Sequence, residues 1–178
     1  CRNPKCDFTT SCGGLGDVIK NKDEAFIVNA LRLIEPNIKD FVLSQNEVLV
    51  DIGLNKRIPI NMMGDGARKI LSILTSIYEC KNGIVLIDEL SNGFHYSVMK
   101  GVWRSIVSVA KKNNVQIFAT THDLDSIKGL RDAAMSGEKY DDFIVCFKLQ
   151  RTSDNELKSY TYSLDSVDYS LTQEIEIR

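Results

Sequence analysis

The 178-residue sequence lacks a long apolar run, and no stretch approaches the ~20 residues that a membrane-spanning helix needs. It also lacks a secretory signal at its start. Neither sign of charge is in excess, because 22 Lys and Arg stand against 24 Asp and Glu for a net charge of −2. This balance gives no indication of a broadly basic surface for nucleic acid, and it leaves room for a local basic patch. We therefore expect a cytoplasmic protein without a membrane partner.

The number of cysteines argues against a fully paired disulfide framework. The chain has five, an odd number: Cys1, Cys6 and Cys12 gather near the start, and Cys80 and Cys146 stand alone. A structural zinc site usually needs four ligands at short paired spacings, so a cysteine-bearing loop is favoured over such a site. Whether the N-terminal cysteines bind a metal stays open. A reducing cytoplasm is the simplest setting for these thiols.

The pattern of apolar and polar residues along the chain predicts an α/β domain over residues 23–178, preceded by a loop or mobile edge over residues 1–22. Helices are expected near 23–34, 67–78, 97–111, 124–135 and 165–172, and strands near 38–43, 47–52, 57–60, 84–87, 115–123, 143–149 and 157–162. Strands and helices alternate in the middle of the chain, which favours a largely parallel sheet with flanking helices. The last two strands are expected to form a small antiparallel addition.

One strand ends in two acids. The continuous apolar run Ile84 to Ile87 is typical of a parallel strand buried on both faces, and Asp88 and Glu89 follow it directly. The next strand ends near His122. Because ligands of parallel sheets bind at the carboxyl ends of the strands, we expect these three side chains at one shared edge.

These residue types suit nucleotide chemistry. Asp88 can hold Mg²⁺, which prefers oxygen ligands and keeps several waters. Glu89 can polarise a water for attack on a γ-phosphate, and His122 can contact the same phosphate or water. Each signal alone is also compatible with solvated acids or a polar histidine at a strand end. Their combination, one crossover apart, favours the nucleotide site.

Three segments carry a resemblance to a known family. "GIVLIDE" resembles the Walker B segment of ABC-type ATPases (residues 84–89), "IFATTHD" their histidine switch (residues 117–123), and "MMGDGARKIL" stands in the place of their signature motif (residues 62–71). The form of these segments is most similar to the OLD-like branch, stand-alone ATPases related to the RecF and SMC repair proteins and often classed as AAA ATPases. The resemblance covers nearly the whole chain, and its motifs keep the family's order.

The resemblance implies a P-loop NTPase fold and a role for each motif. Glu89 takes the place of the catalytic glutamate, His122 that of the switch histidine, and Asp88 that of the Mg²⁺ ligand. ATP and Mg²⁺ are the implied cofactors. A second ATPase protomer, bound head to tail, is the implied partner, and DNA and a separate effector protein are candidate partners. The signature residues would face the ATP of the second protomer: Gly64, Asp65, Gly66 and Arg68.

The sequence departs from the family pattern in two ways. No GxxxxGK[ST] loop (Walker A) is present, and the first residue is Cys1 rather than Met. We therefore expect the chain to be the C-terminal half of an ABC-type ATPase domain, with Walker A in a preceding part. The signature carries Gly64 where a serine is usual and Asp65 where a glycine is usual. Asp65 would repel a phosphate unless it caps the helix instead, which is the alternative for this residue. Arg68 equally fits a solvated basic face.

Two further interpretations stay open. The chain is a non-catalytic interaction module or degenerate remnant if no Walker A belongs to it. A transporter ATPase subunit is a third reading, which the unusual signature disfavours. On the leading interpretation the full-length protein is an ATP hydrolase that acts as a switch in a DNA-related or anti-phage task, and these 178 residues alone are inactive.

Overall fold

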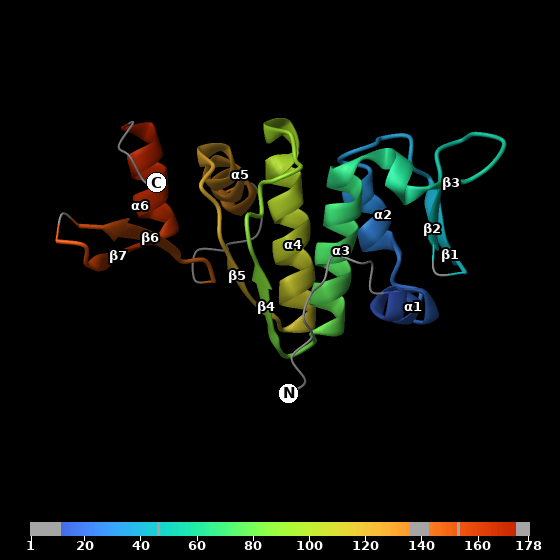
Figure 1. The fold of residues 1–178 in the computed structure, drawn as a ribbon, viewed down its shortest axis with the longest axis horizontal. Coiled ribbons are helices and arrows are strands. Elements are labelled where there is room, and N and C mark those ends of the chain that lie inside the picture. The colour runs from blue at the N-terminus through green and yellow to red at the C-terminus, as the bar shows by residue number, and fades with distance from the viewer. Residues whose placement is uncertain (1–11, 46, 136–142, 153, 174–178) are drawn as a thin grey trace.

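Helices form the centre of the molecule, and three small sheets surround them (Figure 1). The computed structural model describes residues 12–45, 47–135, 143–152 and 154–173. The helices are α1 (Cys12–Lys20), α2 (Ala25–Leu31), η1 (Ile60–Met63), α3 (Asp65–Glu79), η2 (Tyr96–Val98), α4 (Met99–Asn113), α5 (Leu124–Met135) and α6 (Leu164–Thr172). The strands are β1 (Asp40–Ser44), β2 (Glu47–Asp51), β3 (Ile58–Pro59), β4 (Ile84–Ile87), β5 (Gln116–Ala119), β6 (Cys146–Arg151) and β7 (Leu157–Tyr162).

The core lies where α3 and α4 pack together. The helical spacing of apolar residues on α3 places Ile70, Leu74 and Ile77 on one face, and all three are fully buried. From α4, the buried Trp103 donates its Nε1–H to the carbonyl oxygen of Ser126 on α5, at 2.9 Å. Trp103 is therefore a core residue, as the sequence predicts, and it fixes α5 against α4.

The sheets are only partly those expected. β4 and β5 pair in parallel, with Ile87 opposite Ala119, as the strand–helix–strand pattern predicts. β1, β2 and β3 form an antiparallel sheet, and β6 pairs with β7 antiparallel. Among the described residues the parallel arrangement is thus confined to one pair, so a largely parallel sheet is not what the structure has. The reason is local: β1, β2 and β3 follow one another through short loops, as do β6 and β7, whereas β4 and β5 are joined through α4.

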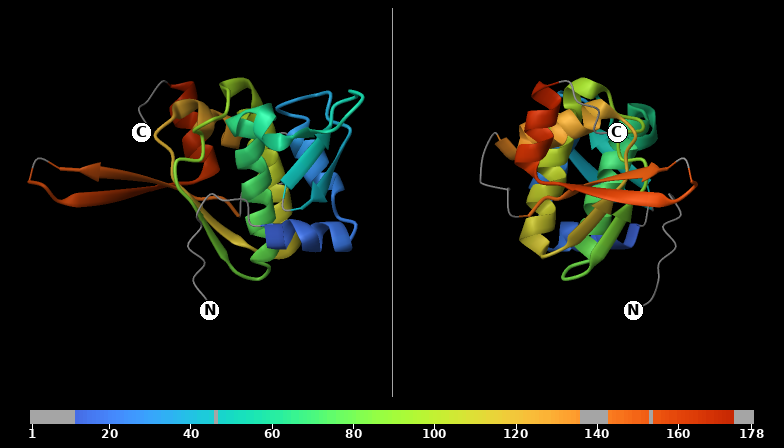
Figure 2. Two further views of the ribbon diagram at one scale, coloured as in Figure 1. Left: turned by 45° about the vertical axis from the view of Figure 1, so that its right-hand side comes forward. Right: turned by 90° about the vertical axis from the view of Figure 1, so that its left-hand side faces the viewer.

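The expectation that β4 is buried on both faces is wrong. Val85 and Ile87 are buried, but Ile84 is 58% and Leu86 75% exposed. The helices lie along one side of the β4–β5 pair (Figures 1 and 2), so alternate side chains point away from them. A run of apolar residues therefore marks a strand here without marking two covered faces.

Residues 12–20 are a helix, not the loop or mobile edge expected for residues 1–22. Gly13, Gly14 and Gly16 lower the helix propensity of this stretch, but Leu15 and Val18, three residues apart, are both buried in the core. Burial outweighs propensity because α1 packs on α3. A Cβ on Gly14 would lie within 2.3 Å of three atoms of the Glu79 side chain, so this glycine permits the contact.

The chain ends in the β6–β7 hairpin and α6, which the sequence predicts, and the hairpin projects away from the helices (Figure 2). The first half of the N-terminal segment, with Cys1 and Cys6, and the final residues 174–178 lie outside the described residues. Within the described ranges, no helix is long and apolar enough to span a bilayer.

Candidate active site

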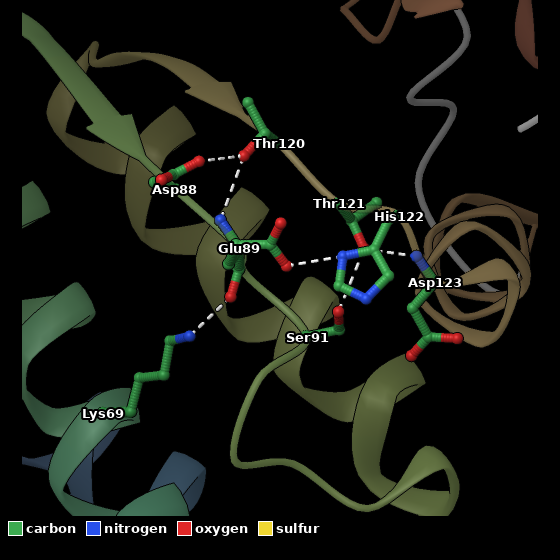
Figure 3. Close-up of polar contacts among 8 residues, drawn as sticks. All are labelled: Lys69, Asp88, Glu89, Ser91, Thr120, Thr121, His122 and Asp123. Carbon is green, nitrogen blue, oxygen red and sulfur yellow. Dashed lines mark hydrogen bonds and ion pairs between the residues drawn. The ribbon is translucent and has the colours of Figure 1, made fainter.

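The exits of β4 and β5 are joined by backbone hydrogen bonds that continue beyond the strands. The N–H of Thr120 donates to the carbonyl of Ile87, and the N–H of Leu90 donates to the carbonyl of Thr120, each at 2.9 Å. The residues that follow the two strands are therefore held side by side (Figure 3). Asp88, Glu89 and His122, which the sequence places at one edge, do come together there.

Thr120 bridges the two carboxylate residues. Its hydroxyl donates to Asp88 Oδ1 at 2.5 Å and accepts the backbone N–H of Glu89 at 3.0 Å. The Asp88 side chain is exposed and directed by this one bond. Sequence reasoning missed Thr120 as a site residue. Its position in the sequence could have indicated this role, because Thr120 directly follows β5 just as Asp88 directly follows β4.

Glu89 and His122 face each other. Glu89 Oε2 lies 2.7 Å from His122 Nδ1, close enough for an ion pair when the imidazole is protonated. The same oxygen is closed off from solvent, so His122 is the polar group that it faces.

The backbone after β5 is fixed by short polar contacts. Ser91 Oγ lies 3.0 Å from Thr121 Oγ1, and Thr121 Oγ1 also accepts the N–H of Asp123 at 3.1 Å. The Asp123 carboxylate accepts the N–H of Asp125 at 2.9 Å and so caps the start of α5. These bonds position the backbone on both sides of His122, whose ring is 75% exposed.

Lys69 enters the site from α3. Its ammonium donates to the carbonyl oxygen of Glu89 at 2.6 Å. Burial lowers the pKa of Lys69, and the negative charges of Glu89 and Asp88 oppose that shift. The sequence marks Lys69 as a basic residue after the signature segment and nothing more. Its contact with Glu89 depends on how α3 packs beside β4, which no local pattern encodes.

The signature segment begins α3. Gly64 has φ 86° and ψ 174°, a conformation essentially restricted to glycine, and it is exposed with open space where a Cβ would be. Asp65 is the first helical residue and its carboxylate forms an ion pair with Arg68, so the alternative that Asp65 caps the helix is wrong. Gly66 is buried instead: a Cβ there would lie 2.9 Å from the carbonyl oxygen of Gly93.

The donor set fits a magnesium nucleotide better than a dedicated metal centre. No three His, Cys, Asp or Glu side chains of the described residues gather in a way that could hold a metal ion. Mg²⁺ at phosphate-transfer sites uses one or two carboxylates, with waters and substrate phosphates completing its shell. Asp88, exposed and held by Thr120, supplies one such carboxylate. The fit to Mg²⁺ rests on this group, which stands at the same edge as the Glu89–His122 pair.

Comparison with known families and sequences gives a family and curated relatives. The model of the AAA ATPase domain matches residues 15–125. An ATP/GTP phosphatase of Helicobacter pylori is 30% identical over 78 residues, which are 42% of this chain and 21% of that protein. An uncharacterised protein of Methanocaldococcus jannaschii is 39% identical over 74 residues, 40% of this chain and 63% of that protein. The chain therefore spans less than two thirds of the length of either relative.

Solved structures share the fold at low sequence identity. An SMC ATPase studied for ATP-driven dimerisation and DNA-stimulated activation matches with a TM-score of 0.55 and 13% identity, over 91% of this chain and 98% of that one. The Smc head bound to the C-winged helix domain of ScpA matches with a TM-score of 0.57 and 13% identity, over 92% of this chain and 50% of that one. The Smc head of Pyrococcus furiosus matches with a TM-score of 0.54 and 14% identity, over 90% of this chain and 40% of that one.

Proposed function

We propose, from the premise that this chain belongs to the AAA ATPase domain family, that it carries the hydrolytic half of a Mg-ATP site in its full-length protein. The observation that supports this most is the Glu89 carboxylate, whose Oε2 lies 2.7 Å from His122 Nδ1 where the two parallel strands end. Asp88 stands next to it at the same sheet edge, as the chemistry of phosphate transfer requires.

Each residue then has a distinct task. Bound Mg²⁺ would supply charge stabilisation to the phosphates, with Asp88 as its protein ligand. Glu89 accepts the proton of the attacking water at Oε1, because Oε2 faces His122. His122 holds the Glu89 carboxylate in place and presents the rest of its exposed ring to the nucleotide. Thr120 links the two residues, since its hydroxyl binds the side chain of Asp88 and the backbone N–H of Glu89.

We place the protein in the OLD-like group of ABC-type switch ATPases, with Walker A in a part of the protein outside these residues. Two protomers would pair head to tail, so that Gly64, Asp65 and Arg68 face the ATP of the partner. The exposure of Gly64, Asp65 and Arg68 supports this arrangement. DNA and a separate effector protein are the proposed partners of the switch, and the cytoplasm its proposed location. The relation to SMC heads supports the dimer by fold alone.

A non-catalytic interaction module is the alternative. The absence of a GxxxxGK[ST] segment from the 178 residues favours it. It predicts that Asp88 and Glu89 are dispensable wherever the protein acts.

Replacing Glu89 with glutamine distinguishes the ATPase from the non-catalytic interaction module. Glu89→Gln in the full-length protein is expected to keep nucleotide binding and to lower ATP hydrolysis by roughly 10²-fold or more, because an amide cannot take a proton from water. Glu156→Gln, an exposed position before the strand β7, is the matched control and should hydrolyse ATP at the parental rate. Near-parental turnover by Glu89→Gln would remove Glu89 from this role.

A further inference from the structure

Lys69 connects the signature helix α3 to the backbone of Glu89. The ammonium lies 2.6 Å from the Glu89 carbonyl oxygen, and Figure 3 shows the side chain reaching from α3 to the end of β4. The same oxygen accepts the N–H of Asn92 at 3.1 Å. Two donors from different elements therefore hold one carbonyl group.

That carbonyl belongs to a residue in an unusual conformation. Glu89 has φ 49°, in the left-handed region that residues other than glycine, Asn and Asp rarely adopt. Such a conformation persists only where the surroundings enforce it. Here the Glu89 N–H is held by Thr120, and its carbonyl by Lys69 and Asn92. Because the backbone conformation sets the direction of Cβ, these bonds also direct the carboxylate.

Lys69 itself is held out of full solvent contact. Its ammonium lies 5.9 Å from the centre of the Phe94 ring, and the residue is half-buried. A lysine more often keeps its charged end in water and buries only its stem. The hydrogen bond to the Glu89 carbonyl replaces contacts that this ammonium would otherwise make with water. The side chain of Lys69 is therefore directed at one backbone group.

We propose that Lys69 is a positioning residue: by holding the Glu89 carbonyl it keeps Glu89 in the left-handed conformation that aims its carboxylate at His122. The inference rests on the proposed function for its consequence in catalysis. It also ties the general base to the helix that would meet the partner's nucleotide, because Lys69 lies one turn after Asp65.

Kinetics of the full-length protein give the first test. Lys69→Met keeps the stem and removes the donor. It should lower kcat for ATP by about 10-fold or more with KM little changed, because a small misplacement of a reacting group is costly. In a Glu89→Gln background the same substitution should cost almost nothing, since Lys69 acts through that carboxylate. Lys112→Met, which removes a lysine hydrogen-bonded to Asp23 away from the site, should leave kcat unchanged. An unchanged kcat in Lys69→Met, or an equal loss in both backgrounds, would overturn the proposal.

The second test needs no nucleotide. The 178 residues contain two histidines, and replacing each in turn assigns the imidazole NMR signals of His122 and His95. Lys69→Met should move the His122 signals toward those of Glu89→Gln, while those of His95, bound to Ser97 at 2.8 Å, stay in place. Lys69→Arg retains a donor and should keep the parental His122 signals. Unmoved His122 signals in Lys69→Met, or Lys69→Arg no closer to the parent than Lys69→Met, would refute the positioning role. A parent protein that hydrolyses no ATP would refute the proposed function alone, and these spectra would still decide on Lys69.

Discussion

Gly66, on the first turn of α3, lies directly against the backbone of Gly93 in the loop that follows β4. A Cβ at residue 66 would stand 2.9 Å from the Gly93 carbonyl oxygen, and also 3.5 Å from the Phe94 ring and 3.6 Å from Ile34. Gly93 has φ 84°, a left-handed conformation that residues other than glycine rarely adopt. The absence of a side chain at Gly66 is therefore explained within one chain, and an approach of Gly66 to a partner's phosphate stays a prediction.

A side chain at Gly66 should accordingly destabilise the monomer. The family resemblance implies that Gly66→Val spares the monomer fold and blocks dimerisation and hydrolysis, but the contact of Gly66 with Gly93 contradicts an undisturbed monomer. We expect Gly66→Ala to lower the free energy of unfolding by about 1–3 kcal/mol, the usual cost of overpacking. Gly16→Ala is the matched control, because α1 leaves open space for its Cβ, and it should be neutral or stabilising. Urea denaturation of both variants measures the difference, and equal stability would contradict the packing argument.

The site illustrates what sequence can and cannot give. Asp88, Glu89 and His122 were predictable as neighbours because strand ends in a parallel pair meet at one edge, a rule that needs only the order of elements. Lys69 and Thr120 were not, because their contacts depend on how far α3 stands from β4 and on the register of β5. The helix α1 was missed for a related reason: three glycines argue against a helix locally, and only the packing of Leu15 and Val18 against α3 overrides them.

A second prediction concerns the contact of Asp23 with α3 and α4. Lys112 Nζ donates to Asp23 Oδ1 at 2.9 Å, and the Tyr78 hydroxyl donates to Oδ2 at 3.0 Å. The hydrogen bond from Lys112, then that from Tyr78, lowers the pKa of Asp23 below its ordinary value of 3.8. The folded state therefore binds this proton more weakly than the unfolded state. The resulting stabilisation is complete above pH 3.8 and is lost as the pH falls through the lower, folded-state pKa.

Asp23→Asn tests that linkage. The variant should be less stable than the parent at neutral pH, and the difference should shrink as the pH falls below 3.8 toward the folded-state pKa. Asp17→Asn is the control, because Asp17 only forms an exposed pair with Lys20. Thermal denaturation across this pH range measures both. A stability difference for Asp23→Asn that does not depend on pH would contradict the assignment.

Thr120 should govern the magnesium requirement of the full-length protein. Thr120→Val keeps the shape of the side chain and removes the hydroxyl that directs Asp88. We expect a higher Mg²⁺ concentration at half-maximal ATPase rate, in the same direction as Asp88→Asn but smaller. Mutating groups that orient a metal ligand typically costs 10- to 100-fold in metal affinity, roughly the scale expected here. Thr161→Val, on the exposed strand β7, is the control. An unchanged Mg²⁺ dependence would separate Thr120 from metal binding.

The 178 residues by themselves should bind Mg-ATP only weakly and should not turn it over. They contain no GxxxxGK[ST] loop, so the backbone cradle and the lysine that hold the β- and γ-phosphates are not among them. Isothermal titration of the isolated chain with Mg-ATP, with Asp88→Asn in parallel, measures this. Micromolar affinity that survives Asp88→Asn would mean that nucleotide binds elsewhere on the chain.

Mixing two inactive variants of the full-length protein decides whether the signature segment acts on a partner's nucleotide. Arg68 is 51% exposed and pairs only with the exposed Asp65, so Arg68→Glu should fold normally. In a head-to-tail dimer it should abolish hydrolysis, because it places a carboxylate next to the partner's phosphates.

Glu89→Gln disables the other side of the same composite site. A mixed dimer of the two then has one site with both defects and one site with none, so hydrolysis should return on mixing, toward half the parental rate per dimer. If each protomer hydrolyses ATP by itself, every subunit keeps its own defect, and no activity returns. Mixed dimers without recovered activity, confirmed by native mass spectrometry, would refute the shared site and leave Arg68 as part of a solvated helix face.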